Sequence, residues 1–85
     1  MVKNPVNNIS DFSFITPAHI RGARAWIGWK LEEMRTKSGV DKDTISRFEL
    51  NKQGLRNATL ARLYLACFEA GVEILPDGLR VRETA

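Results

Sequence analysis

Residues 27–49 read IGWKLEEMRTKSGVDKDTISRFE, and one glycine, Gly39, divides them into two halves. Apolar side chains recur in both halves at positions where two short helices, crossing at a steep angle, would turn them toward a shared core. These side chains are Ile27, Trp29, Met34, Val40, Ile45 and Phe48. With Gly39 at the corner, the pattern predicts a helix-turn-helix.

The outer side of the second helix in this pair is polar. Its side chains are Lys42, Asp43, Ser46 and Arg47. Groups of this size and chemistry reach base edges and phosphates in a DNA major groove. The outer face of an exposed helix is usually only solvated, however, and short amphipathic helices also build protein-interaction modules. The pattern by itself therefore leaves DNA binding and protein binding both open.

The chain is predicted to begin with a flexible arm, residues 1–14, because this segment is polar and has few large apolar groups before Phe12. A first helix follows the arm. Thr16 is a good N-cap, and Pro17 suits the first helical position because its missing N–H needs no partner there. Gly28 is expected to end this helix.

Three more helices are predicted after the first. Residues 31–38 form the second, and residues 42–49 form the third with Asp41 as its N-cap. Asn57 is expected to cap the fourth and longest helix, which Gly71 stops by adopting a left-handed conformation. The inward side chains of this helix are Leu60, Leu63, Tyr64, Cys67 and Phe68.

The C-terminal segment, residues 72–85, has hairpin chemistry. Apolar and polar residues alternate over residues 72–82 around a turn at Pro76-Asp77-Gly78. A two-stranded hairpin is marginal alone in water, so its apolar side chains need another surface. We expect the strand edge to pair with the same strand of a second copy, which forms a homodimer by two-fold symmetry. The alternative is a hairpin folded onto its own domain.

Composition is compatible with a small intracellular DNA-binding protein. With 85 residues, of which 44% are hydrophobic, the chain makes one small domain. Its net charge is +3, and residues 1–40 carry six Lys and Arg against three Asp and Glu. Cys67 is the single cysteine, which excludes an internal disulfide and fits the cytoplasm. No stretch approaches the length of a membrane span, so no membrane partner is expected.

No catalytic or metal-binding arrangement is found in the sequence. His19 is the single histidine, and neither a second histidine nor a second cysteine completes a metal site. Glu32 and Glu33 are interpreted as a charged helix face, since nothing encloses them. We therefore expect no enzyme, no metal and no cofactor.

Two motifs flank the helix-turn-helix. Residues 15–29 read ITPAHIRGARAWIGW, and residues 71–78 read GVEILPDG. Together with the motif between them, they resemble the Cro/lambda-repressor type of helix-turn-helix regulator. The resemblance is to a small bacterial and phage subfamily that opens with T-P-x-x-I/L-R-x-A-R-x-x-I/L-G-W and closes with G-V-E-x-L/I-P-D-G. It covers about residues 15–82. It implies a mainly α fold, in which a four-helix lambda-repressor-like DNA-binding domain, residues 15–71, carries a short C-terminal β-hairpin.

The resemblance implies that four outward side chains of the third helix read bases: Lys42, Asp43, Ser46 and Arg47. Arg47 can present two donors to guanine N7 and O6, and Lys42 can do so less rigidly or hold a phosphate. Asp43 could accept from a cytosine amino group. We favour for it the role of a helix N-terminal charge that orients Arg47 or Lys42.

Four further residues are expected to contact DNA phosphates: Lys30, Thr44, Lys52 and Arg56. Such contacts carry affinity and salt dependence, not sequence preference. Thr44 is equally well an ordinary first-turn residue, and each of the others has the alternative of a solvated cation. Arg24 and Glu49, by the same resemblance, form a partly buried ion pair that ties the first helix to the end of the third.

The departures from the family pattern lie in the second helix. Lys30 and Leu31 occupy positions where Ser and Gln are usual, and lysine cannot cap a helix. Arg35 occupies a position where a small residue normally lets the two motif helices touch. Arg35 either lays its stem along the surface with its charge outside or holds the helices farther apart. These departures are expected either to shift the orientation of the motif on DNA or to abolish DNA binding.

The sequence thus predicts a cytoplasmic transcriptional regulator, a repressor or autoregulator that acts as a homodimer on a short two-fold site in double-stranded DNA. The runner-up is a protein-interaction module on the same fold, such as an antitoxin-like or adaptor protein, in which DNA binding is secondary or absent.

Overall fold

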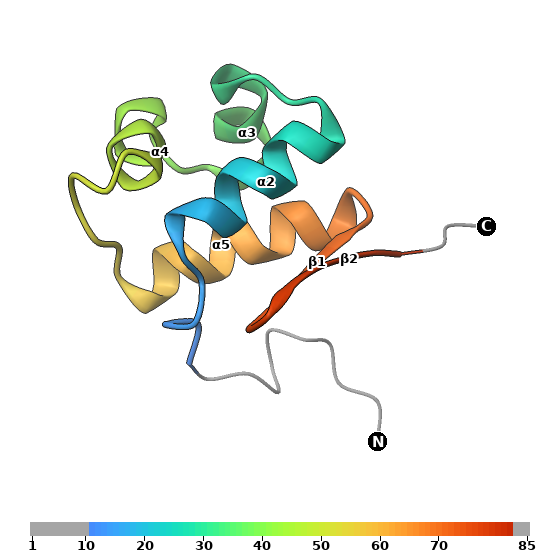
Figure 1. Ribbon diagram of the computed structural model, residues 1–85. Coiled ribbons are helices and arrows are strands. Elements are labelled where there is room, and N and C mark those ends of the chain that lie inside the picture. The colour runs from blue at the N-terminus through green and yellow to red at the C-terminus, as the bar shows by residue number, and fades with distance from the viewer. Residues whose placement is uncertain (1–10, 83–85) are drawn as a thin grey trace.

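Four helices followed by a two-stranded antiparallel hairpin make up the computed structural model, which describes residues 11–82 (Figure 1). The first helix, α2, spans Pro17–Ile27, as predicted. The hydroxyl of Thr16 accepts the backbone N–H of His19 at 3.2 Å, and Nδ1 of His19 accepts the backbone N–H of Thr16 at 2.9 Å. Two side chains thus satisfy two backbone donors where the helix begins. Gly28, with a φ of 87°, ends it.

Helices α3, Leu31–Ser38, and α4, Lys42–Glu49, have the bounds that the sequence predicts. Gly39 lies between them with a φ of 75°, a left-handed conformation that glycine adopts without steric cost. The carboxylate of Asp41 accepts two backbone N–H groups of the first turn of α4, at 3.0 and 3.3 Å. The predicted cap of α4 is therefore confirmed.

Helix α5, Asn57–Glu69, is the longest of the helices in residues 11–82. The prediction that Asn57 caps it is wrong, because Asn57 is its first helical residue and Arg56 occupies the cap position without a side-chain hydrogen bond. The side chain of Asn57 instead accepts the backbone N–H of Phe12 at 2.5 Å. Gly71, with a φ of 104°, follows the helix as predicted.

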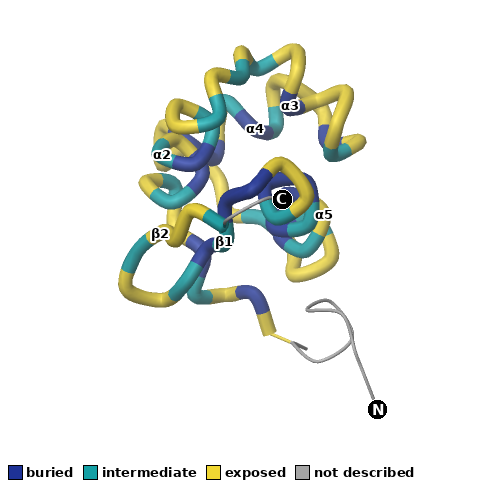
Figure 2. The backbone as a smooth tube through the Cα atoms, turned by 90° about the vertical axis from the view of Figure 1, so that its right-hand side faces the viewer, coloured by how far each residue is buried: buried dark blue, intermediate teal, exposed yellow. Residues whose placement is uncertain are grey.

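The hairpin consists of β1, Val72–Leu75, and β2, Gly78–Val81. Leu75 pairs with Gly78, so β2 begins one residue earlier than the sequence indicated. Strand β1 packs against α2 and α5, and its apolar side chains belong to the main core. Strand β2 is mostly exposed (Figure 2). The hairpin therefore does not form a unit separate from residues 15–71.

The core lies between the inner faces of the helices and β1. Its buried members are Phe12, Ile15, Ile20, Ala23, Met34, Val40, Ile45, Phe48, Leu60, Leu63, Tyr64, Ala66, Cys67, Val72 and Ile74. Ile27, Trp29 and Phe68, predicted to point inward, are only partly buried. Burial raises the pKa of the Cys67 thiol to about 12, so this group is a neutral core side chain at ordinary pH. Among the helices of residues 11–82, none is long and apolar enough to cross a membrane.

The predicted arm, residues 1–14, extends too far along the chain. Phe12 is only 2% exposed, and its ring centroid lies 5.3 Å from that of Tyr64 on α5. Its carbonyl accepts the backbone N–H of Ile15 at 3.0 Å. Residues 11–14 therefore belong to the folded domain, because one large apolar side chain and a long-range hydrogen bond attach them to α5. Residues 1–10 of the predicted arm lie outside the described residues.

Candidate nucleic-acid interface

The inner side of α4 is fixed to the core, which leaves its predicted reading side outward. Ile45 and Phe48 are buried, and the Asp41 cap holds the first turn. On the other side of the helix, Lys42, Asp43 and Arg47 are exposed and Ser46 is half-buried. The helical period of 3.6 residues thus separates the packed and the polar sides as the sequence pattern predicts.

Three of the four predicted base-reading side chains line one shallow depression of about 450 Å³. Its lining residues are Asp43, Ser46, Arg47, Leu50 and Lys52. The depression thus joins the side of α4 to Lys52, one of the four predicted phosphate contacts. Leu50, which is 58% exposed, was not anticipated from the sequence. An exposed apolar group beside donors is the kind of surface that contacts the methyl group of thymine.

The C-terminal turn of α4 sets Lys52 beside Arg47. Asn51 has a φ of 62°, a left-handed conformation that asparagine tolerates better than most residues. The N–H of Lys52 donates to the carbonyl of Arg47 at 2.8 Å, and the N–H of Asn51 donates to that of Phe48 at 3.0 Å. This is the hydrogen-bond pattern of a Schellman motif. The chain therefore turns back toward the helix, and Lys52 lies at its outer side.

Lys42 lies outside this depression, in a cluster with two residues of α3. Its Nζ is 3.4 Å from Oε1 of Glu32, while Nε and Nη2 of Arg35 lie 3.0 and 2.5 Å from Oε2 of the same carboxylate. We call these three side chains the Glu32 cluster. The guanidinium of Arg35, followed by the ammonium of Lys42, holds the pKa of Glu32 below its ordinary value. Arg35 was expected either to keep its charge outside or to hold the motif helices farther apart. It is exposed, so its charge lies at the surface.

Of the predicted phosphate contacts, Lys52 alone lines the depression. Lys52 borders the depression, whereas Lys30 lies before α3 and Arg56 before α5, all three exposed. Thr44 is half-buried in the first turn of α4. As expected, Lys30 does not cap α3.

The start of α3 is capped by a different side chain. Oε1 of Glu33 accepts the backbone N–H of Lys30 at 2.5 Å. A glutamate at the third helical position can satisfy a donor in this way without a capping hydroxyl. The absence of the usual serine at position 30 therefore leaves this end of α3 with one side-chain hydrogen bond.

The predicted ion pair between Arg24 and Glu49 is confirmed. Nε and Nη2 of Arg24 lie 2.9 and 2.8 Å from the two carboxylate oxygens, and Nη1 donates to the carbonyl of Trp29 at 3.1 Å. Glu49, the last residue of α4, is 5% exposed, and its backbone carbonyl accepts from Arg21. The carboxylate hydrogen bond raises the pKa of Arg24. Two arginines of α2 therefore fix the end of α4.

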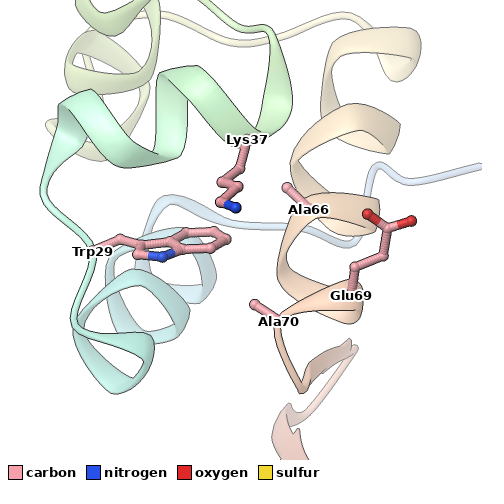
Figure 3. Close-up of a pocket in the computed structure, with 5 residues that line it drawn as sticks. All are labelled: Trp29, Lys37, Ala66, Glu69 and Ala70. Carbon is pink, nitrogen blue, oxygen red and sulfur yellow. The ribbon is translucent and has the colours of Figure 1, made fainter.

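A second depression lies between α3 and α5, away from the polar side of α4. Trp29, Lys37, Ala66, Glu69 and Ala70 line it. Figure 3 shows Lys37 pointing from α3 toward the indole ring of Trp29, with the two alanines of α5 facing them. Its volume of about 130 Å³ is well below the roughly 300 Å³ at which small-molecule pockets begin. Within residues 11–82, no group of three His, Cys, Asp or Glu side chains is arranged to hold a metal ion.

The depression thus gathers a carboxylate, a hydroxyl and an arginine from α4 with a leucine and a lysine that follow this helix, whose two ends are fixed. Comparison of the chain with models of known protein families finds no match, and comparison with curated proteins finds no significant similarity.

Proposed function

We propose that the chain is a sequence-specific regulator of transcription that binds double-stranded DNA in the cytoplasm and reads the major groove with α4. The observation that carries the proposal is the shared depression of Asp43, Ser46, Arg47, Leu50 and Lys52. A major groove about 12 Å wide admits one helix, and the side chains on its outer side then meet base edges. The resemblance of the sequence to Cro-type repressors supports the same assignment.

In this arrangement the residues have separate tasks. Arg47 donates to N7 and O6 of a guanine, because a guanidinium offers two parallel N–H groups. Ser46 adds a hydroxyl one residue before it, and Leu50 covers a thymine methyl group. Lys52 holds a phosphate at the groove edge, which contributes to affinity without selecting sequence. Asp43, an exposed carboxylate, keeps the two roles that the sequence left open.

A second copy of the chain is the expected partner on a two-fold site. Strand β2 leaves Leu79 at 37% and Val81 at 51% exposure, and Trp26 on α2 is 66% exposed. Leu79 packs over Gly22, because a methyl group on this glycine would lie 3.2 Å from Leu79 Cδ1. Trp26 is one turn beyond Gly22 on the same helix face.

These apolar side chains are proposed to form one surface. Helix α2 and strand β2 are in contact and run the same way in Figure 1. One helical turn, about 5.4 Å, is close to two residues of strand, about 6.6 Å. From these spacings we expect Val81 to lie level with Trp26 when Leu79 lies over Gly22. Strand β2 lies away from α4 in Figure 1, so a partner copy seated on this strand would leave the proposed reading side free.

The runner-up is a protein-interaction module, favoured by the mixed character of the depression, where an exposed leucine and a carboxylate lie beside the cations. Binding of purified protein to random duplexes over a range of salt concentrations separates the two functions. A steep loss of affinity with salt marks a surface that binds phosphates, whereas no binding to any duplex favours a protein partner. Enrichment of random duplexes then gives the preferred site.

Arg47→Ala is expected to weaken binding to the preferred duplex by about 1 to 3 kcal/mol and to relax the preference at one base position. Lys52→Ala is the matched control, since it removes a neighbouring cation and should weaken all duplexes alike. Both are measured by fluorescence anisotropy on the preferred and on scrambled duplexes. Unchanged affinity and preference in Arg47→Ala would mean that another face reads the DNA.

Val81→Glu is expected to convert a dimer to a monomer, because it places a charge in the middle of an apolar interface. Ala58→Glu, which adds the same charge at an exposed position of α5, serves as the control. Sedimentation velocity reports the oligomeric state. A dimer unaffected by Val81→Glu would place the interface elsewhere.

A further inference from the structure

The Glu32 cluster links α3 and α4, the two helices of the helix-turn-helix, through ion pairs at the surface. One carboxylate pairs with two cations: Arg35, three residues along the same helix, and Lys42, the first residue of α4. All three side chains are about half exposed. Exposed ion pairs contribute little to folding, because water already solvates each charge well. Breaking these ion pairs therefore costs little free energy.

The arrangement also matches the way in which cations bind phosphate. The guanidinium of Arg35 directs Nε and Nη2 to a single oxygen of Glu32, and the ammonium of Lys42 approaches the other oxygen. Guanidinium and ammonium groups make the same contacts to the non-bridging oxygens of a phosphate. Lys42 directly precedes Asp43 of the depression, so the cluster borders the side that is proposed to face DNA.

We propose that Glu32 is an exchangeable counter-ion, which holds Arg35 and Lys42 in the free protein and gives them up to backbone phosphates of the DNA. The inference rests on the proposed function and adds a residue that sets the affinity for DNA. Arg35 then becomes a phosphate contact beside Lys42. Glu32 lowers affinity for every duplex, because its carboxylate competes with phosphate for both cations and is repelled by the phosphates once they arrive.

Glu32→Gln in the full chain tests the proposal against a matched neighbour. It should tighten binding to random and preferred duplexes alike, by about two- to fivefold at low salt, the range that one exposed charge interaction provides. The slope of log affinity against log salt should become steeper by up to about 0.9, the value of one additional phosphate contact. Glu33→Gln removes the same charge from the next residue, which caps Lys30 and is paired with neither Arg35 nor Lys42. Its effect should be clearly smaller.

Arg35→Ala tests the other side of the exchange. It should weaken binding to random duplexes and reduce the magnitude of the salt slope by about 0.9. Thermal unfolding midpoints of all the variants should stay close to that of the parent, because the cluster is exposed. Equal gains in affinity from Glu32→Gln and Glu33→Gln would overturn the exchange, since net charge alone would then explain both. An unchanged salt slope in Arg35→Ala would also overturn it. If the parent protein bound no duplex at any salt concentration, the proposed function would fail first and this inference with it.

Discussion

Arg24→Ala is expected to lower the free energy of unfolding by about 3 to 5 kcal/mol, because it leaves the carboxylate of Glu49 buried without a counter-charge. Chains of this length have a total stability of about 4 to 13 kcal/mol, so the variant should be close to the limit of folding. The loss should appear as a lower midpoint of urea unfolding, followed by circular dichroism. Arg62→Ala, an exposed arginine of α5, is the control and should change little.

A double-mutant cycle separates the ion pair from the packing of each side chain. Glu49→Ala should cost less than Arg24→Ala, since Arg24 is partly exposed and keeps its hydrogen bond to the carbonyl of Trp29. Apolar replacement of both residues together should recover part of the loss, because no buried charge then remains. Strictly additive single and double effects would show that the two groups are not coupled.

Phe12→Ala is expected to destabilise the domain by a similar amount, about 3 to 5 kcal/mol. The substitution removes a fully buried ring that contacts Tyr64, and it loosens the segment whose backbone N–H binds Asn57. The cavity left behind would be bordered by α5, a rigid helix that cannot easily collapse into it.

Ser13→Ala is the matched control for Phe12, since Ser13 is adjacent and exposed. Urea unfolding should leave its midpoint within the range of ordinary surface substitutions. Asn57→Ala should give an intermediate loss, because it removes the side-chain hydrogen bond to the backbone of Phe12 but leaves the buried ring in place. If Phe12→Ala unfolded at the same urea concentration as Ser13→Ala, residues 11–14 would not be part of the folded domain in solution.

The helix bounds could be predicted because their causes are local. Gly28, Gly39 and Gly71 each adopt the left-handed conformation that ends a helix or makes a turn, and Thr16 and Asp41 supply capping oxygens within three residues of the donors they satisfy. Such contacts depend on residues that are close together in the sequence, so sequence motifs predict them. The apolar period then gives the inner faces, so the core of α4 and α5 followed from the pattern.

What the sequence did not reveal are contacts between residues far apart in the chain. Asn57 is a good capping residue by type, yet its side chain binds the backbone of residue 12, which lies 45 positions earlier. Phe12 was assigned to the arm, because its ring partner Tyr64 lies on α5, far along the chain. Lys42 was expected to read a base or hold a phosphate, and the sequence did not indicate that Glu32 pairs with it across the turn. The Arg24–Glu49 pair was accessible only through the family resemblance, since nothing local links these two positions.

The brevity of α4 has a consequence for the entropy of binding. A helix of eight residues would be mostly unfolded as a free peptide, because isolated helices need about 12 to 15 residues to persist. Here Asp41 closes one end of it, and Arg21 and Arg24 secure the other through Glu49. The order of its backbone is thus established during folding, before any partner arrives, and association need not supply it. A change that loosened either end would weaken the proposed DNA recognition from a distance, with every side chain proposed to contact DNA still in place.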